Sequence, residues 1–382
     1  MTTLTQEGTA KPKTDFVAIA SQLAPRFAER AAKCDADDTF VAENYAEMKT
    51  AKLFSAPVPA ELGGGGATYA EHAAIIRTIA YHCGSTALSY SMHSHLLQAL
   101  IWRHRHNAQP PAEPLLRRIA AEELVLVSSG GSDWLDGSGT LTKNDGGYVF
   151  SARKRFGSGG PAGDLLLTTG VYDDPQNGPT VYHFGVNMRG EGVRVLDNWR
   201  TLGMRATGSN DIEIQSVFVP EGGISVRRPK GKWHQFFNVI SPIVWPLVYA
   251  AYLGVAESAR DIALAQAAKR KGEAKIQSLL GQMDTELSTA RDLFEVMRTF
   301  ASTDFTPNLE NADLAYKRKV VIARSLLRTV ELALEIAGGA GFYRALGLER
   351  RFRDIQGVRY HPFTQADQSE FAGRIALGLE PV

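Results

Sequence analysis

The sequence predicts a mainly α-helical protein with a β domain at its centre. Apolar residues recur at helical spacing over residues 15–121, and they return to this spacing over residues 231–382. Between these regions, residues 122–230 contain short runs that are typical of β-strands. Residues 1–14 are polar, and we expect them to form a disordered tail. The predicted order is therefore helices, a β domain and a helical bundle.

The first helical region is recognised by the spacing of its apolar side chains. Phe16, Ile19, Leu23 and Phe27 recur at the three- and four-residue steps of one helix face. A glycine-rich stretch at residues 61–66 then interrupts the pattern, so that we expect two helical segments joined by a loop.

Turn sequences divide the central region and indicate an antiparallel domain. The β-branched and aromatic runs include residues 124–127, 148–150, 165–168 and 181–184. Clusters of Asn, Asp, Gly and Pro at residues 144–147, 173–175 and 177–179 lie between them. From about residue 236 onward helical spacing continues, with breaks near residues 306–307 and 338–339, which predicts a bundle of long helices.

Composition narrows the functional classes. Hydrophobic residues make up 44% of the 382 residues and charged residues 22%, which is ordinary for a globular enzyme. The net charge of +1 gives no reason to expect a nucleic acid or an anionic membrane as partner. We find neither a secretory signal nor an apolar run of about 18 residues, the length that a membrane span requires. Since Cys34 and Cys83 are the only cysteines, we expect no disulfide framework and a cytoplasmic enzyme.

A Gly/Ser turn after the first strand of the central region is a candidate binding loop. Ser129, Gly131 and Ser132 lie in this turn, where backbone N–H groups and hydroxyls have little steric cover. Such a turn can approach an anion or a polar ring edge closely. A solvent-facing β-turn is the alternative interpretation.

Phe156 and Ser158 form a second candidate. Residues two positions apart on a strand point to the same side, so that Phe156 can pack against a planar ring while Ser158 donates to a ring nitrogen. A core phenylalanine followed by a turn is the alternative. A third segment, residues 197–211, is rich in Arg, Thr and Ser, and such a loop is suited to lining a pocket wall.

Histidines give the remaining candidates. The pairs His93 with His95 and His104 with His106 have a two-residue spacing that suits no single helix face, and no carboxylate or cysteine accompanies them. We therefore expect no metal site. For His361, packing in the last loop and a catalytic role both stay open.

Five segments, taken together and in this order, resemble motifs of the acyl-CoA dehydrogenase superfamily over about residues 15–375. They are residues 61–64, residues 131–133, Phe156 with Ser158, residues 201–211, and residues 338–342 followed by Arg353-Asp354. The resemblance implies an N-terminal helical domain, a small antiparallel β-barrel, a C-terminal four-helix bundle and a homotetramer. It also implies a flavin, FAD or FMN, bound by Ser129, Gly131, Ser132, Phe156, Ser158, Gly338, Gly339 and Gly341.

The catalytic carboxylate of that superfamily is missing. Acyl-CoA dehydrogenases use a Glu to remove the α-proton, and it usually lies nine residues after the Arg of the late Arg-Asp pair. Pro362 occupies that position here. Some members place the base at the start of the first bundle helix, but residues 243–246 also lack a carboxylate. Because general-base catalysis contributes roughly 10²–10⁴-fold, an efficient ordinary dehydrogenase is not expected.

Two further departures concern the dinucleotide half of FAD. The family's Arg-x-x-Phe is replaced by residues 270–273, which lack the aromatic residue, and its usual Gln is Glu335. An acidic group near a pyrophosphate is unfavourable, which favours weak FAD binding or FMN.

These departures are similar to those of the flavin-dependent monooxygenases of this superfamily, such as the dibenzothiophene monooxygenase type. That resemblance makes His361, Ser158 and His95 the catalytic candidates, with His93 as an alternative register for His95. We favour a monooxygenase that uses reduced flavin, with a flavin reductase as partner and a small molecule as substrate. There are two alternatives. One is an acyl-CoA dehydrogenase with a base elsewhere or an unusual acyl substrate, and the other is an inactive flavin- or acyl-binding protein.

Overall fold

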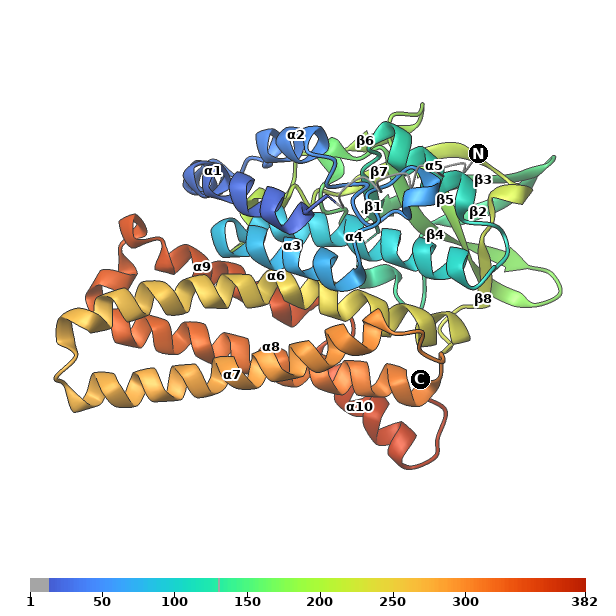
Figure 1. The fold of residues 1–382 in the computed structure, drawn as a ribbon. Helices are drawn as coiled ribbons and strands as arrows, with labels where there is room; N and C mark the ends of the chain where they lie inside the picture. The colour runs from blue at the N-terminus through green and yellow to red at the C-terminus, as the bar shows by residue number, and fades with distance from the viewer. Residues whose placement is uncertain (1–13, 130) are drawn as a thin grey trace, which may run out of the picture.

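The computed structural model describes residues 14–129 and 131–382, except for the side chain of Ser132. The expected tail up to residue 13 and the expected role of the Ser132 side chain therefore lie outside the described part. Helices come first, strands follow, and long helices end the chain, as the sequence predicts (Figure 1).

The N-terminal region consists of five helices, α1 to α5, within the described residues. They are α1 (Phe16–Ala36), α2 (Ala42–Thr50), α3 (Tyr69–His82), α4 (Gly84–Arg105) and α5 (Glu113–Glu122). The glycine-rich stretch forms the loop before α3. A Cβ on Gly64 would lie 2.3 Å from the Val58 carbonyl oxygen, so this loop packs too closely for a side chain. Thr68 and Glu71 form a capping box that begins α3.

Eight strands follow and form one sheet. They are β1 (Leu126–Ser128), β2 (Thr140–Asn144), β3 (Gly147–Lys154), β4 (Leu165–Asp174), β5 (Gly178–Asn187), β6 (Val193–Val195), β7 (Ile212–Pro220) and β8 (Val226–Pro229). Their order is β6-β7-β3-β2-β4-β5-β8, with β1 paired to β4. The β1–β4 and β2–β4 pairs are parallel and the others are antiparallel, so the expected antiparallel character holds for most of the sheet.

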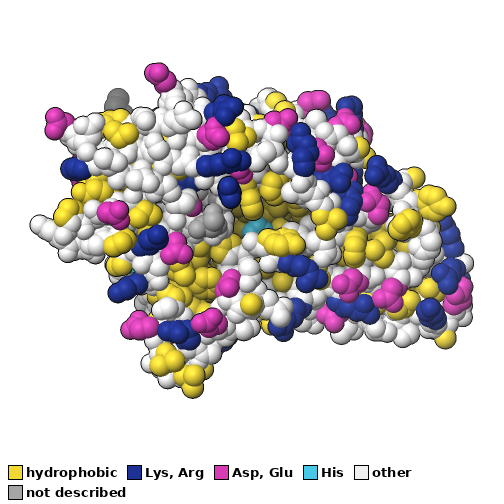
Figure 2. All heavy atoms as spheres, turned by 180° about the vertical axis from the view of Figure 1, so that it is seen from behind, with side chains coloured by type: hydrophobic (Ala, Val, Ile, Leu, Met, Phe, Trp, Pro, Cys, Tyr) yellow, Lys and Arg dark blue, Asp and Glu magenta, His cyan; other side chains and the backbone are white. Residues whose placement is uncertain are grey.

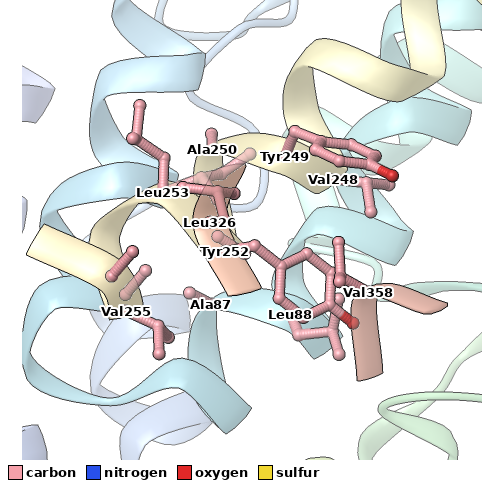
Figure 3. Packing of buried hydrophobic residues seen from close by; sticks show 14 of the residues in the cluster. Ala87, Leu88, Val248, Tyr249, Ala250, Tyr252, Leu253, Val255, Leu326 and Val358 are labelled. Carbon is pink, nitrogen blue, oxygen red and sulfur yellow. The ribbon is translucent and has the colours of Figure 1, made fainter. Parts of the chain in front are cut away.

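The C-terminal region is a bundle of three long helices with shorter ones against it. The long helices are α6 (Gln235–Ala267), α7 (Ala274–Ser302) and α8 (Leu309–Ala337), followed by α9 (Leu348–Ile355) and α10 (Gln365–Ala376). They run side by side beneath the N-terminal helices, and α6 lies between the two layers (Figure 1). In Figure 3, Tyr252 and Val255 of α6 lie near Leu88 and Ala87 of α4, and Leu253 of α6 lies near Leu326 of α8.

Helix α6 corrects one expectation from the sequence. Together with the turn after it, residues Gln235–Arg270, it is long and apolar enough to cross a membrane by composition. Our expectation that no apolar run reaches that length is therefore wrong. However, 89% of its most apolar window is buried inside the molecule, as is usual for the central helix of a packed bundle.

His93 joins the N-terminal helices to the sheet. Its side chain is fully buried on α4, where Nε2 donates to the Phe54 carbonyl oxygen at 2.9 Å and Nδ1 accepts from the Leu126 N–H at 3.0 Å. These two partners fix one neutral tautomer. Burial lowers the pKa of His93 to about 4, because the charged ring would lose its hydration. His93 is thus a structural residue, and of the two alternatives on α4 only His95 remains as a catalytic candidate.

We expect His93 to make the folded state sensitive to acid. Between pH 6.5 and about 4 the unfolded imidazole binds a proton that folded His93 does not bind, so stability falls as the pH falls through this window. The contribution reaches at most about 1.4 kcal/mol per pH unit. In His93→Gln this contribution disappears. The free energy of unfolding in urea, measured at pH 7, 6 and 5, should therefore depend less on pH in the variant than in the wild type. Ser89→Ala, at a buried site on the same helix without a titrating group, is the control; equal slopes for wild type and His93→Gln would contradict the assignment.

Candidate active site

A cavity of about 1100 Å³ lies between the sheet, helices α4 and α6, and the chain around α9 and α10. Figure 2 shows a hollowed face with hydrophobic side chains and a histidine in the hollow, and Lys and Arg side chains at its edge. The sequence candidates His95, Ser129, Gly131, Phe156, Ser158 and His361 all line this cavity. The fold thus brings together candidates that are separated by up to 266 positions in the sequence.

The wall on the sheet side is formed where β3 ends. Phe156 keeps 38% of its surface exposed, although it is a large hydrophobic residue, and its ring lies 5.0 Å from that of Trp199. Backbone hydrogen bonds from Gly157 N to Asn210 O (3.0 Å) and from Gly159 N to Thr207 O (2.9 Å) dock this segment on the 207–210 loop. The docking places the side chain of Ser158 against that loop.

A chain of three hydroxyls runs inward from Ser158. Its Oγ lies 2.7 Å from Oγ of Ser209, which lies 2.6 Å from Oγ1 of Thr207. Thr207 Oγ1 in turn donates to the carbonyl oxygen of Met204 at 2.9 Å. Ser158 and Ser209 line the cavity, whereas Thr207 is completely buried.

Two buried cations hold the Gly/Ser loop that begins with Ser129. The ammonium of Lys154, which is fully buried, bonds to Asp133 Oδ2 at 2.7 Å and to the carbonyl oxygens of Ser138 and Thr169, each at 2.7 Å. Arg228 donates to the carbonyl oxygen of Trp134 at 2.8 Å. Buried charges need such partners, so the loop is fixed at the edge of the cavity before any ligand binds.

Two histidines line the cavity, His95 from α4 and His361 from the chain that precedes α10. Nδ1 of His95 lies 3.1 Å from the Ser91 carbonyl oxygen, which can only accept, so Nδ1 carries the proton and Nε2 is left as an acceptor. Nε2 of His361 lies 2.7 Å from the hydroxyl of Tyr252, which also lines the cavity. Burial lowers the pKa of His95 to about 4 and that of His361 to about 3. Both rings are therefore neutral at neutral pH.

Lys319 positions the loop that carries His361. From α8, its ammonium donates to the carbonyl oxygens of His361 at 3.0 Å and Pro362 at 2.6 Å, and it lies 4.0 Å from the ring centre of Trp245. Burial lowers the pKa of Lys319 well below its usual range, and its positive charge adds to the lowering of the His361 pKa. His361 consequently has a defined position rather than that of a free loop residue.

The late Arg-Asp pair has a structural role. Asp354 accepts from the N–H of Met204 at 2.5 Å, and Arg353 donates to Asp35 on α1 at 2.6 Å. Gly203 lies so close to α9 that a Cβ would meet the Arg353 carbonyl oxygen at 2.1 Å. These contacts fix the 201–205 loop as part of the cavity wall.

Neither position of the superfamily's base carries a carboxylate. Pro362 lines the cavity, and so do Val244 and Trp245 of the 243–246 stretch, so both locations face the space where a substrate would bind. The carboxylates among the described cavity-lining residues are Asp136, Asp367 and Glu370. Asp367 caps α10, and its Oδ2 accepts hydrogen bonds from the N–H and the hydroxyl of Thr364.

The second glycine motif lies apart from this cavity. Gly338, Gly339 and Gly341 form a short 3-10 turn after α8, and none of them is among the described residues that line the cavity. Gly338 and Gly339 are exposed beside Phe342, which is 89% exposed. Within one chain the expected cofactor-binding residues therefore fall into two separate groups.

Sequence reasoning missed the residues that support the candidates. Tyr252 and Lys319 lie inside long helices, where their spacing indicates only a helix, and the contact with the His361 loop arises from tertiary packing. Ser209 and Thr207 lie in the polar 197–211 loop, which the sequence does single out as a pocket wall, but their connection to Ser158 depends on strand pairing.

The cavity fits a flavin. Its lining suits a planar tricyclic ring, because it includes the partly exposed ring of Phe156 and the hydroxyl of Ser158. Val244, Trp245 and Val248 add an apolar wall. Arg155 also lines the cavity, where a guanidinium can attract a phosphate. Phe156 and Ser158 would hold the ring, and the loop at Ser129 and Gly131 would contact its polar edge.

Comparisons with known proteins agree with this geometry. The acyl-CoA dehydrogenase N-terminal domain matches residues 17–123 and the acyl-CoA dehydrogenase C-terminal domain matches residues 247–366. An L-evernosamine nitrososynthase from a Micromonospora species is 27% identical and covers 93% of this chain and 88% of its own length. A dibenzothiophene monooxygenase from Mycolicibacterium goodii is 26% identical over 91% of this chain and 90% of its own.

A solved structure shows the same likeness in three dimensions. KijD3, in complex with FMN and a dTDP-linked amino keto sugar, superimposes with a TM-score of 0.86 at 27% identity, covering 98% of this chain and 96% of KijD3. With both terminal domains matched in order around the sheet, the chain belongs to the acyl-CoA dehydrogenase superfamily, and its relatives include flavin-dependent nitrososynthases and monooxygenases.

Proposed function

We propose that this chain is a flavin-dependent monooxygenase that takes reduced flavin from a separate reductase. One observation carries the proposal: Pro362 and, from the 243–246 stretch, Val244 face the cavity at the two locations where the resemblance to dehydrogenases of this fold implies a base. Neither side chain can accept a proton, whereas the neutral rings of His95 and His361 in the same cavity can.

The histidines give this site its acid–base groups. When bound, reduced flavin supplies two electrons to dioxygen, so that one oxygen atom passes to the substrate and the other leaves as water. Nε2 of His95 can accept a proton or a hydrogen bond from a group in the cavity. Tyr252 pairs with His361, so that a proton taken up at either group can be shared along a 2.7 Å hydrogen bond.

FMN is the flavin that the charges favour. Arg270, in the stretch where the family reaches a dinucleotide, is held by Glu273 at 2.7 Å. Glu335 lies 3.1 Å from Arg328 in the same helix, so that this arginine is engaged by a carboxylate of its own helix. The KijD3 structure contains FMN. The proposal includes a homotetramer, in which the exposed turn at residues 338–342 packs against a neighbouring subunit. It also includes a cytoplasmic location.

The substrate that the cavity favours is a small molecule with a large apolar face. Hydrophobic side chains from α4, α6, α10 and the segment after β1 line it, among them Leu88, Met92, Trp134, Trp245, Val248 and Phe371. The relatives include enzymes named for a nitroso product and for a sulfur heterocycle, so we propose oxygenation at nitrogen or sulfur of an aromatic amine or thioether.

An oxygenation assay tests the proposed function directly. The purified chain, FMN, NADH and a flavin reductase are incubated under ¹⁸O₂ with a panel of aromatic amines and thioethers. We expect mass spectrometry to show one ¹⁸O atom per product molecule, and bound FAD to keep its colour with acyl-CoAs of any chain length. Bleaching of FAD by an acyl-CoA, without labelled product from the panel, would show a dehydrogenase instead.

Replacing the cavity histidines should remove most of the activity. We expect His361→Gln and His95→Gln each to lower kcat by about 10²–10⁴-fold, the usual contribution of a general acid–base group. His104→Gln, on the same helix as His95 but outside the described cavity lining, is the matched control with unchanged activity. Unchanged kcat in both cavity variants would contradict their role.

The low pKa values of these histidines predict the pH profile. Because the neutral ring is the reactive form and the pKa values lie at about 4 and about 3, initial rates should not decline as the pH falls from 8 to 6. Loss of activity on acidification is expected only below about pH 5. An initial-rate profile with a midpoint near 6.5 would instead indicate a solvated imidazole.

A further inference from the structure

The chain of hydroxyls behind Ser158 has a direction. Each of Ser158, Ser209 and Thr207 carries one hydroxyl proton, and each can donate one hydrogen bond. The Met204 carbonyl oxygen can only accept, so the proton of Thr207 points to it. Ser209 must then donate to Thr207, and Ser158 must donate to Ser209.

Burial keeps this direction fixed. Thr207 is completely buried and Ser209 is 2% exposed, so that water cannot replace a lost bond without cost. The two serine hydroxyls have no further hydrogen-bond partner within residues 14–129 and 131–382. The N–H of Met204 donates to Asp354, and this bond fixes the residue at which the row of hydroxyls ends. If every hydrogen bond in this row pointed the other way, the oxygens of Thr207 and Met204 would lie 2.9 Å apart with no proton between them.

Ser158 therefore presents lone pairs, not a proton, to the cavity. This differs from the donor role that the sequence favours for Ser158. A reduced flavin carries a hydrogen on N5, whereas the same atom of an oxidised flavin carries a lone pair. An acceptor beside that ring edge matches the reduced form and opposes the oxidised one.

We propose that Thr207 and Ser209 are specificity-determining residues: they polarise Ser158 as an acceptor and so make the site select reduced over oxidised flavin. The inference rests on the proposed function and deepens it, because it gives a physical reason for release of flavin after oxidation. Thr207 and Ser209 act through Ser158 and are positioning residues.

Anaerobic titrations of oxidised FMN and of dithionite-reduced FMN measure this selection. We expect the wild type to bind the reduced form at least about tenfold more tightly, since an unpaired acceptor in a buried contact costs that much or more. In Thr207→Val the row of hydroxyls loses its hydrogen bond to the Met204 carbonyl oxygen. The hydroxyl proton of Ser158 can then point into the cavity. The ratio of the two affinities should fall by about tenfold, and the two-electron potential of bound FMN should fall by about 30 mV.

Three variants separate this effect from damage to the fold. Thr207→Ser keeps the donor and should retain the wild-type ratio, and Ser209→Ala, which frees Ser158, should behave like Thr207→Val. Thr329→Val removes another fully buried hydroxyl that donates to a carbonyl, on α8, and should also leave the ratio unchanged. Circular dichroism verifies that each variant is folded.

The outcomes distinguish the inference from the proposed function. Equal affinity of the wild type for the two forms of FMN, or an unchanged ratio in folded Thr207→Val, would overturn the inference and leave the monooxygenase proposal standing. No binding of either form would overturn both. A lowered ratio in Thr207→Val together with a normal ratio in Thr207→Ser would support the inference, since a merely structural role of Thr207 would weaken both forms equally.

Discussion

Burial of polar groups around the cavity is the constraint on which the site depends. A polar group removed from water must find a partner within the protein, and once it has found one its proton has a fixed place. This fixes the tautomer of His93 between α4 and β1 and that of His95 on the cavity side. It also holds Lys154 against the Gly/Ser loop, so the cavity wall is formed by the chain itself.

The same constraint divides residues of one type into different roles. His93 and His95 are two positions apart on α4, yet one has both ring nitrogens bonded to backbone groups and the other has one nitrogen left for the cavity. The pKa is lowered to about 4 in each case, so a lowered pKa alone does not separate the buried His93 from the cavity-lining His95. The two residues are distinguished by the hydrogen-bond partners of their ring nitrogens.

Much of the fold and part of the site could be predicted from the sequence. Helical spacing and turn clusters place helices, strands and bundle in the right order, because those patterns are local. Phe156 and Ser158 both line the cavity, but the expectation that they lie on a strand is wrong: β3 ends at Lys154, and both residues belong to the segment that follows it. The contacts of Lys319 with the His361 loop and of Asp354 with Met204 could not be predicted, because they join segments that are 42 and 150 residues apart.

The hydroxyl chain leads to a different expectation for Ser158 from the one that the local sequence gives. A serine beside a ring nitrogen is expected to donate, since its hydroxyl rotates to suit its partner. Here the rotation is decided three oxygens away, by a carbonyl that cannot donate. The bonding role of Ser158 therefore depends on Thr207, which lies 49 positions later in the sequence and does not line the cavity. Because a proton position propagates along a buried chain of hydroxyls, a residue without contact to the ligand can set which redox form of that ligand fits.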